Sequence, residues 1–150
     1  MMIASSMGAT AFQKGLGAMH SLSHPCSANL NTHHGLTNAV VMPYVLAWNR
    51  PAIESKMVRL AAFLGLPQHS FAGVLDWILE LRRTIGIPHT LAELGVTEEH
   101  AVAFAPQAFE DPSTGGNPLP MTSEKFAMLY RNCIKGTTDR NGSTGQIGAL

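Results

Sequence analysis

The first 53 residues of this 150-residue chain carry only two charged side chains, Lys14 and Arg50, and the first acidic residue is Glu54. Charged residues make up 13% of the whole chain, about half the share that is usual in soluble domains. A segment so poor in charge is hard to solvate as an exposed surface. We therefore expect residues 1–53 to be buried against other protein.

The hydrophobic pattern predicts an all-α fold. Apolar residues recur at helical spacing, and no segment alternates convincingly enough for a β-sheet. Residues 35–48 are apolar on almost every side, which is typical of a buried helix, with a kink at Pro43 and with Tyr44 and Trp48 in the core. The expected helices cover residues 1–24 (weakened at Gly15 and Gly17), 35–48, 52–64, 70–84, 97–109 and 122 onward, with one turn at 90–93 and loops at 29–34 and 111–122.

We expect one helical domain over residues 1–135 and a disordered tail over residues 136–150, which are rich in Gly, Thr, Ser and Asn. The formal net charge is zero at pH 7, so nothing favours binding to nucleic acid. No run of about 18 strongly apolar residues predicts a membrane span, and the apolar start of the chain has no basic residue before it. Cys26 and Cys133 form no disulfide framework. These features favour a cytoplasmic protein with no nucleic-acid or membrane partner.

Three histidines in the charge-poor segment, His20, His24 and His34, have the spacing of a metal site. His20 and His24 are four residues apart, so on a helix their side chains project from one face and can converge on one ion. His34 returns across the expected loop and can approach from a second side. Imidazole suits Fe(II), Zn(II), Co(II) and Ni(II) alike, so the spacing does not select the metal. A catalytic metal usually also has a carboxylate ligand, and this segment contains none.

The residues alone leave other interpretations open. In a chain with seven histidines, this spacing also arises among surface or hydrogen-bonded core side chains. The spacer between His20 and His24 contains no glutamate, which excludes the H-E-x-x-H motif of zinc hydrolases. Cys26 is an alternative metal ligand, and His33 beside His34 makes the ligand register ambiguous. Solvated or capping roles are expected for His69, His89 and His100, and a solvated helix face for Arg82 and Arg83.

The segments around the histidines closely resemble the iron-containing (group III) alcohol dehydrogenases. The resemblance rests on GLGAMHSLSHP at residues 15–25 and HGLTNAVVMPYVL at residues 34–46. It continues through Asn49, LGLP at 64–67, Ile87 and Pro88, LGV at 94–96 and NPLP at 117–120, and so covers residues 1–135. The chain departs from the family pattern at Cys26 and Ser27, where the family commonly has Leu-Gly or a similar pair.

The resemblance implies roles for the three histidines. His20 and His34 match two metal ligands of the family, and the Gly35 and Asn38 that follow favour His34 over His33. The family's Asp ligand and first His ligand have no counterpart in the chain. His24 matches a catalytic histidine beside the substrate and the nicotinamide, which is implicated in proton relay and positioning.

The resemblance also implies cofactors and partners. The metal is expected to be Fe(II), with Zn(II) as the alternative, and NAD or NADP is expected to bind to an N-terminal α/β domain that this chain lacks. The substrate class is a small alcohol or aldehyde, and full-length relatives are expected to be homodimers.

Three hypotheses follow for the function. The first is an iron-type alcohol dehydrogenase, represented by its metal-binding C-terminal half. The second is a catalytically inactive helical fragment that acts only by associating with another subunit. The third is an independent metal-binding module, completed by acidic residues from Glu54 onward.

Overall fold

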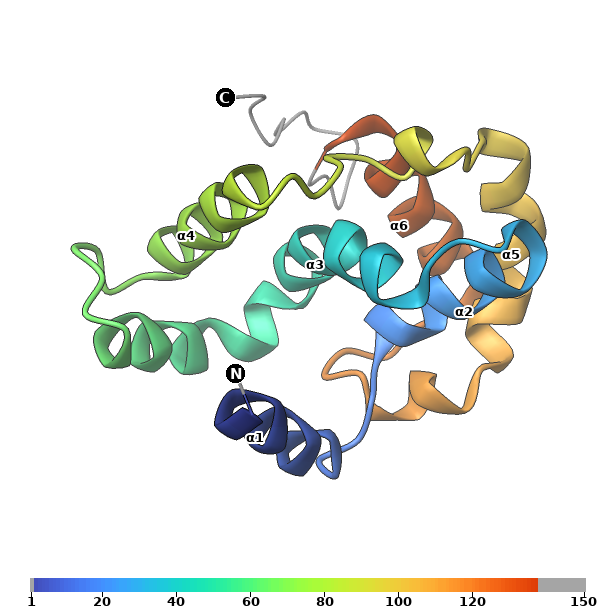
Figure 1. The fold of residues 1–150 in the computed structure, drawn as a ribbon. Coiled ribbons are helices and arrows are strands. Elements are labelled where there is room, and N and C mark those ends of the chain that lie inside the picture. Colours follow the sequence, from blue (N-terminus) through green and yellow to red (C-terminus); the bar gives the residue numbers. More distant parts are fainter. Residues whose placement is uncertain (1, 138–150) are drawn as a thin grey trace.

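The structure, a computed structural model, describes residues 2–137. Helices make up most of this part of the chain (Figure 1). The all-α expectation is confirmed, since no β-strand is assigned among those residues. The expected tail lies almost entirely outside the described residues, and the domain boundary at residue 135 stays a prediction. The elements in chain order are α1 (Met2–Phe12), α2 (Ala18–Leu30), α3 (His34–Phe63), α4 (Phe71–Thr84), η1 (Ala92–Leu94), α5 (Glu98–Glu110), η2 (Pro112–Gly116) and α6 (Ser123–Lys135).

Polar side chains start three of the helices at the residues that the sequence predicts. Ser70, Thr97 and Thr122 each accept a hydrogen bond from the backbone N–H three residues later. His100 accepts a hydrogen bond from the Thr97 backbone in return, so this helix start is a reciprocal capping box. The single predicted turn near residue 90 is present as η1.

The helix α3 is longer than the sequence predicts. Two helices were expected, at 35–48 and 52–64, and the structure has one continuous helix of 30 residues. Pro43 and Pro51 each lack an N–H and so remove one helical hydrogen bond, and α3 bends along its length without ending (Figure 1). Packing at both ends sustains it, because Tyr44 is buried among α2 and α6 whereas Met57 is buried against α4.

Two hydrophobic clusters share α3. The main cluster lies among α2, the first half of α3, α5 and α6, and includes the predicted core residues Tyr44 and Trp48, which are 1% and 6% exposed. The smaller cluster joins the second half of α3 to α4, and its buried residues are Met57, Ala61, Phe71, Val74 and Ile78.

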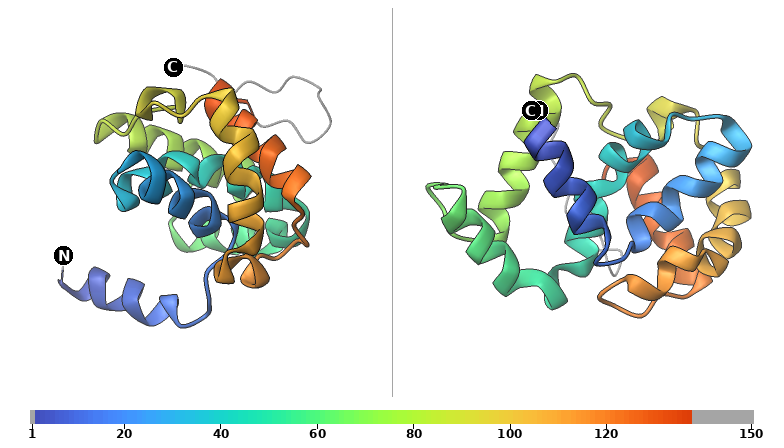
Figure 2. Two further views of the ribbon diagram at one scale, coloured as in Figure 1. Left: turned by 90° about the vertical axis from the view of Figure 1, so that its right-hand side faces the viewer. Right: turned by 60° about the horizontal axis from the view of Figure 1, so that its bottom comes forward.

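Burial of the charge-poor segment differs between its helices. The expected helix over residues 1–24 is broken at Gly15, which has a φ of +94°, and so becomes α1 and α2. The helix α2 and the first half of α3 supply much of the main core. In contrast, α1 has no buried residue and projects away from the other helices (Figure 2, left), with Met2 and Ile3 88% and 78% exposed.

The expected solvated pair of arginines is wrong for one of its members. Arg83 is exposed and pairs with Glu80, but Arg82 is only 4% exposed. Its Nη2 group donates hydrogen bonds to the carbonyl oxygens of Pro88 and His89, whereas its Nε and Nη1 atoms are buried without a hydrogen-bond partner in the described part of the chain. None of the described helices is long and apolar enough to span a membrane.

Candidate metal centre

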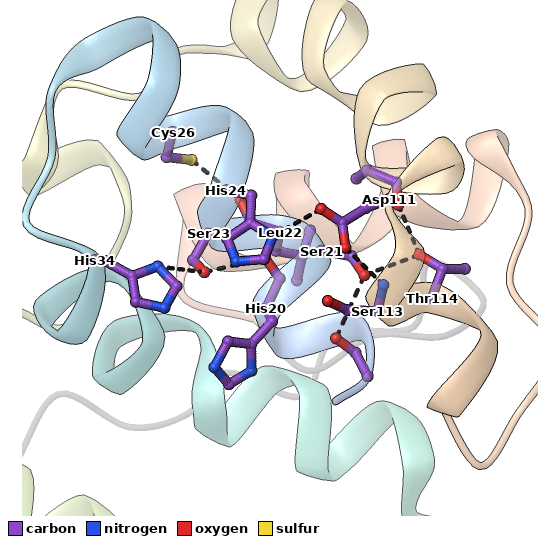
Figure 3. A network of polar contacts seen from close by, with 12 residues as sticks. His20, Ser21, Leu22, Ser23, His24, Cys26, His34, Asp111, Ser113 and Thr114 are labelled. Atoms are coloured by element: carbon purple, nitrogen blue, oxygen red, sulfur yellow. Dashed lines mark hydrogen bonds and ion pairs between the residues drawn. The ribbon is translucent and has the colours of Figure 1, made fainter. Parts of the chain in front are cut away.

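The structure brings the three candidate histidines together beside the junction of α2 and α3 (Figure 3). His20 and His24 project from successive turns of α2, and His34 is the first residue of α3. The ring centroid of His34 lies 5.3 Å from that of His20 and 5.2 Å from that of His24. Those of His20 and His24 are 5.9 Å apart.

A tight reversal between the two helices places His34. Asn31 ends α2 in the left-handed conformation, with a φ of 53°, so the chain turns back within the next two residues. The Nδ1 atom of His33 accepts a hydrogen bond from the Leu36 backbone and caps α3. Because His33 is engaged as a cap, the ring that lies beside His20 is that of His34.

The Nε2 atoms of His20 and His34 point toward one side-chain amide. The Nδ2 atom of Asn38, one turn further along α3, lies 2.9 Å from Nε2 of His34 and 3.4 Å from Nε2 of His20. On its other side, the His34 ring has Nδ1 at 3.3 Å from the Ser23 hydroxyl, which itself donates to the carbonyl of His20. Nδ1 of His34 therefore carries the proton, and its Nε2 presents a lone pair.

Burial and mutual repulsion keep two of these rings neutral. The pKa of His20 is lowered by burial and then by the neighbouring His34 and His24. The pKa of His34, which is exposed on one side, is lowered by partial desolvation and then by its neighbours His24 and His33. A neutral imidazole is the form that binds a metal ion, so both rings are in the ligating state near pH 7.

The donor set fits part of a metal site. Two converging imidazole nitrogens suit a divalent transition metal, and the hydroxyl of Ser23 orients one of them as outer-shell groups do in metal sites. Within residues 2–137, no group of three or more His, Cys, Asp or Glu side chains has the geometry to hold an ion.

One acidic residue that the sequence did not single out does reach the cluster. Asp111, at the end of α5, has Oδ2 2.7 Å from Nδ1 of His24, and its side chain is 12% exposed against 41% for His24. Burial opposes its ionisation, but the hydrogen bonds from His24 and from Ser113 prevail and lower the pKa of Asp111 below its usual value. The two residues are 87 positions apart, so only the tertiary fold reveals the pair.

A sequence signal for Asp111 does exist in the D-P-S-T order of residues 111–114. Asp followed by Pro is a common start for a turn, and Oδ1 of Asp111 caps η2 by accepting from the Ser113 N–H at 2.8 Å. Thr114 then contacts the Ser21 hydroxyl at 2.8 Å and donates to the Ala108 carbonyl, which ties η2 to α2 and α5 (Figure 3). The Asp111 carboxylate is therefore held rigidly beside His24.

Cys26, the alternative ligand, takes no part in the cluster. Its thiol is fully buried and donates to the Leu22 carbonyl on the same helix (Figure 3). Burial raises the pKa of the Cys26 thiol to about 12, which disfavours its thiolate form.

Fold and site define an all-α domain with a histidine cluster suited to a divalent metal. Residues 1–134 match the Fe-containing alcohol dehydrogenase family, C-terminal. The chain belongs to this family, and its fold is that of the family's helical C-terminal domain. The solved structure of a 1,3-propanediol oxidoreductase superposes with a TM-score of 0.75 and 27% identity, over 79% of this chain and 33% of that one.

Curated relatives share the same partial coverage. The 4-hydroxybutyrate dehydrogenase of Cupriavidus necator is 41% identical over 144 residues, which is 90% of this chain and 36% of the relative. The lactaldehyde reductase of Escherichia coli (strain K12) is 34% identical over 122 residues, which is 77% of this chain and 32% of the relative. The chain thus spans about a third of the length of the curated relatives it matches.

Proposed function

We propose that this chain supplies the metal-binding half of an iron-type alcohol dehydrogenase, which transfers hydride between a small alcohol and NAD or NADP. The observation that carries the proposal is the convergence of the Nε2 atoms of His20 and His34 on one point, the Asn38 amide. Family membership supports it, because the relatives are alcohol dehydrogenases and related oxidoreductases.

In this proposal, His20 and His34 hold Fe(II), with Zn(II) as the alternative metal. The chemistry that such an ion supplies is polarisation of the substrate oxygen, which lowers the pKa of a bound alcohol. The remaining ligands and the NAD or NADP site belong to the part of the relatives that this chain does not cover. We further propose a cytoplasmic homodimer for the complete enzyme, with a small alcohol, aldehyde or ketone as its substrate.

His24 serves as the proton-handling residue of the proposal. The Asp111 carboxylate accepts a hydrogen bond from the Nδ1–H group of His24, so the lone pair of the neutral ring lies on Nε2. Nε2 can then take up a proton released from an alcohol, and the adjacent carboxylate stabilises the imidazolium that forms. Because the His24 side chain is 41% exposed, a small molecule can reach it.

The test of the proposed ligands is metal binding by the 150-residue chain. Zn(II) affinity is measured by competition with a chromophoric chelator, and Fe(II) affinity in the same way without oxygen. We expect His20→Ala and His34→Ala each to weaken binding by about tenfold or more, because each removes one of two ligands. His69→Ala is the matched control and leaves binding unchanged. Equal affinities for all these proteins would rule out the proposed site.

The second candidate function is association without catalysis. It is favoured by α1, whose residues are all exposed and uncharged and include the large apolar side chains of Met2, Ile3, Met7 and Phe12. In this case the purified chain does not oxidise ethanol or 4-hydroxybutyrate in the presence of NAD and Fe(II). Steady turnover that His20→Ala abolishes would contradict an inactive fragment.

A further inference from the structure

Asn38 lies between the His20 and His34 rings of the histidine cluster, although a side-chain amide is not a typical ligand of a divalent transition metal. It stands four residues after His34 on α3, and its Nδ2 atom is shared by the His34 and His20 rings at 2.9 Å and 3.4 Å. Its Oδ1 atom is buried and is among the side-chain atoms without a hydrogen-bond partner in the described part of the chain. This amide therefore satisfies the two imidazoles at the expense of its own oxygen.

The direction of these hydrogen bonds is fixed by chemistry. An amide NH2 group has two hydrogens to donate and no lone pair to offer, so Nε2 of His34 and Nε2 of His20 both accept. Each ring then carries its proton on Nδ1 and turns its free lone pair toward the amide. These are the same two lone pairs that would bind an ion, so the ion and this arrangement of Asn38 exclude each other.

We propose that Asn38 occupies the place of the cation in the metal-free chain and has to turn away before an ion binds to His20 and His34. Its two N–H groups hold both lone pairs in the convergent orientation, as the ion would. This inference rests on the proposed function, because it takes His20 and His34 to be ligands.

An ion has to replace two neutral hydrogen bonds to Asn38 before it can bind, and this requirement weakens the site by about tenfold, which corresponds to about 1.4 kcal/mol. The opposite effect, loss of ring orientation, is limited in an Asn38→Ala variant because Ser23 still contacts the His34 ring. We therefore expect Asn38→Ala to bind Zn(II) about tenfold more tightly than the natural chain. Affinity equal to or weaker than that of the natural chain would overturn the inference.

A second variant tests the same position with the opposite chemistry. Asn38→Asp replaces the amide by a carboxylate of the same shape, and two histidines with one carboxylate form a set that is typical of non-haem Fe(II) sites. We expect it to bind Zn(II) and Fe(II) at least about tenfold more tightly than Asn38→Ala does. An affinity no higher than that of the natural chain would show that Asn38 does not lie where the cation binds.

Two further measurements separate the possible failures. If His34→Ala weakens binding but Asn38→Ala does not tighten it, the inference fails and the proposed ligands stand. If His34→Ala has no effect, the proposed function itself fails.

Nitrogen NMR of the chain without added metal tests the hydrogen bonds from Asn38 directly. The Nε2 resonances of His20 and His34 should both be those of hydrogen-bond acceptors, and both should shift in Asn38→Ala. Unchanged Nε2 resonances in a variant with natural helicity would overturn the inference.

Discussion

At the scale of single residues, Asn117 joins three segments of the chain. Its side-chain amide exchanges a pair of hydrogen bonds with Asn49 of α3, at 2.8 Å and 2.9 Å. Its Oδ1 atom also accepts from the backbone of Ala18 at the start of α2, where Gly17 offers no side-chain cap. The position of His20, two residues further along α2, thus depends on a contact with a loop far away in sequence.

Replacing Asn117 should therefore destabilise the fold. Asn117→Ala leaves the amide of Asn49, which is 5% exposed, without its partner, and we expect a loss of about 2–3 kcal/mol in the free energy of unfolding by urea. Asn49→Ala should have a similar effect, and the double variant should lose about 1 kcal/mol less than the sum. The control is Asn29→Ala at an exposed position, with an expected change of about 0.5 kcal/mol or less. Additive effects of the two substitutions would contradict a shared contact.

The spacing of His20, His24 and His34 in the sequence predicted that these three residues cluster, but it did not predict the Asp111 carboxylate beside His24. Helical spacing links residues that are one turn apart, whereas Asp111 reaches His24 only because α5 packs on α2. Arg82 was misjudged for a related reason. Its partners are backbone carbonyls of residues 88 and 89, and a side-chain pattern contains no information about them.

At the scale of elements, short polar caps fix where helices begin. Glu93 of η1 accepts hydrogen bonds from the backbone N–H groups of His89 and Thr90 at 2.9 Å and 2.8 Å. Chiefly through the bond from the Thr90 backbone, the pKa of Glu93 is lowered below its usual value. The ionised carboxylate therefore stabilises the fold above the pKa of the unfolded chain, and this contribution is lost as the pH falls through the lower pKa of the folded state.

This linkage predicts a pH-dependent effect of Glu93→Gln. Near pH 7 the variant should be less stable by about 0.5 kcal/mol, a small value because the side chain is exposed to solvent. The difference should shrink toward zero between about pH 5 and about pH 3, as the natural carboxylate becomes protonated. Urea unfolding at a series of pH values measures it. Glu99→Gln removes one charge at an exposed site of α5 and is the control; an identical pH profile for both variants would argue against the cap.

Element boundaries were predictable where caps set them and unpredictable where packing did. Thr97 and Thr122 start their helices as residue type predicts. The sequence predicts a break between residues 48 and 52, but α3 continues through this segment, Pro51 included. The reason is tertiary: Trp48 before it and Met57 after it are both buried, in two different clusters.

At the scale of the whole molecule, the two hydrophobic clusters differ in size and both include residues of α3, and Leu79 of α4 also packs against the larger cluster. The histidine site belongs to the larger one, since α2 and the first half of α3 carry its residues. The smaller cluster holds the pair formed by α4 and the second half of α3, which extends away from the other helices (Figure 1). A small cluster buries less apolar surface, so its cooperative unit should open at a lower free energy than the rest of the fold.

Native-state hydrogen exchange can measure this difference. Val74→Ala, at a fully buried site of α4, should lower the opening free energy of amides in α4 and in the second half of α3 by about 2 kcal/mol. Amides of α2 and α6 should retain their protection, because they do not pack on that cluster. Leu129→Ala, at a fully buried site of the main core, is the matched variant and should lower the opening free energy of all these helices by about 2–5 kcal/mol. A uniform loss of protection in Val74→Ala would mean that the two clusters unfold as one unit. Retained protection around His20 and His34 would instead show that the pair formed by α4 and the second half of α3 can open while the candidate metal centre stays folded.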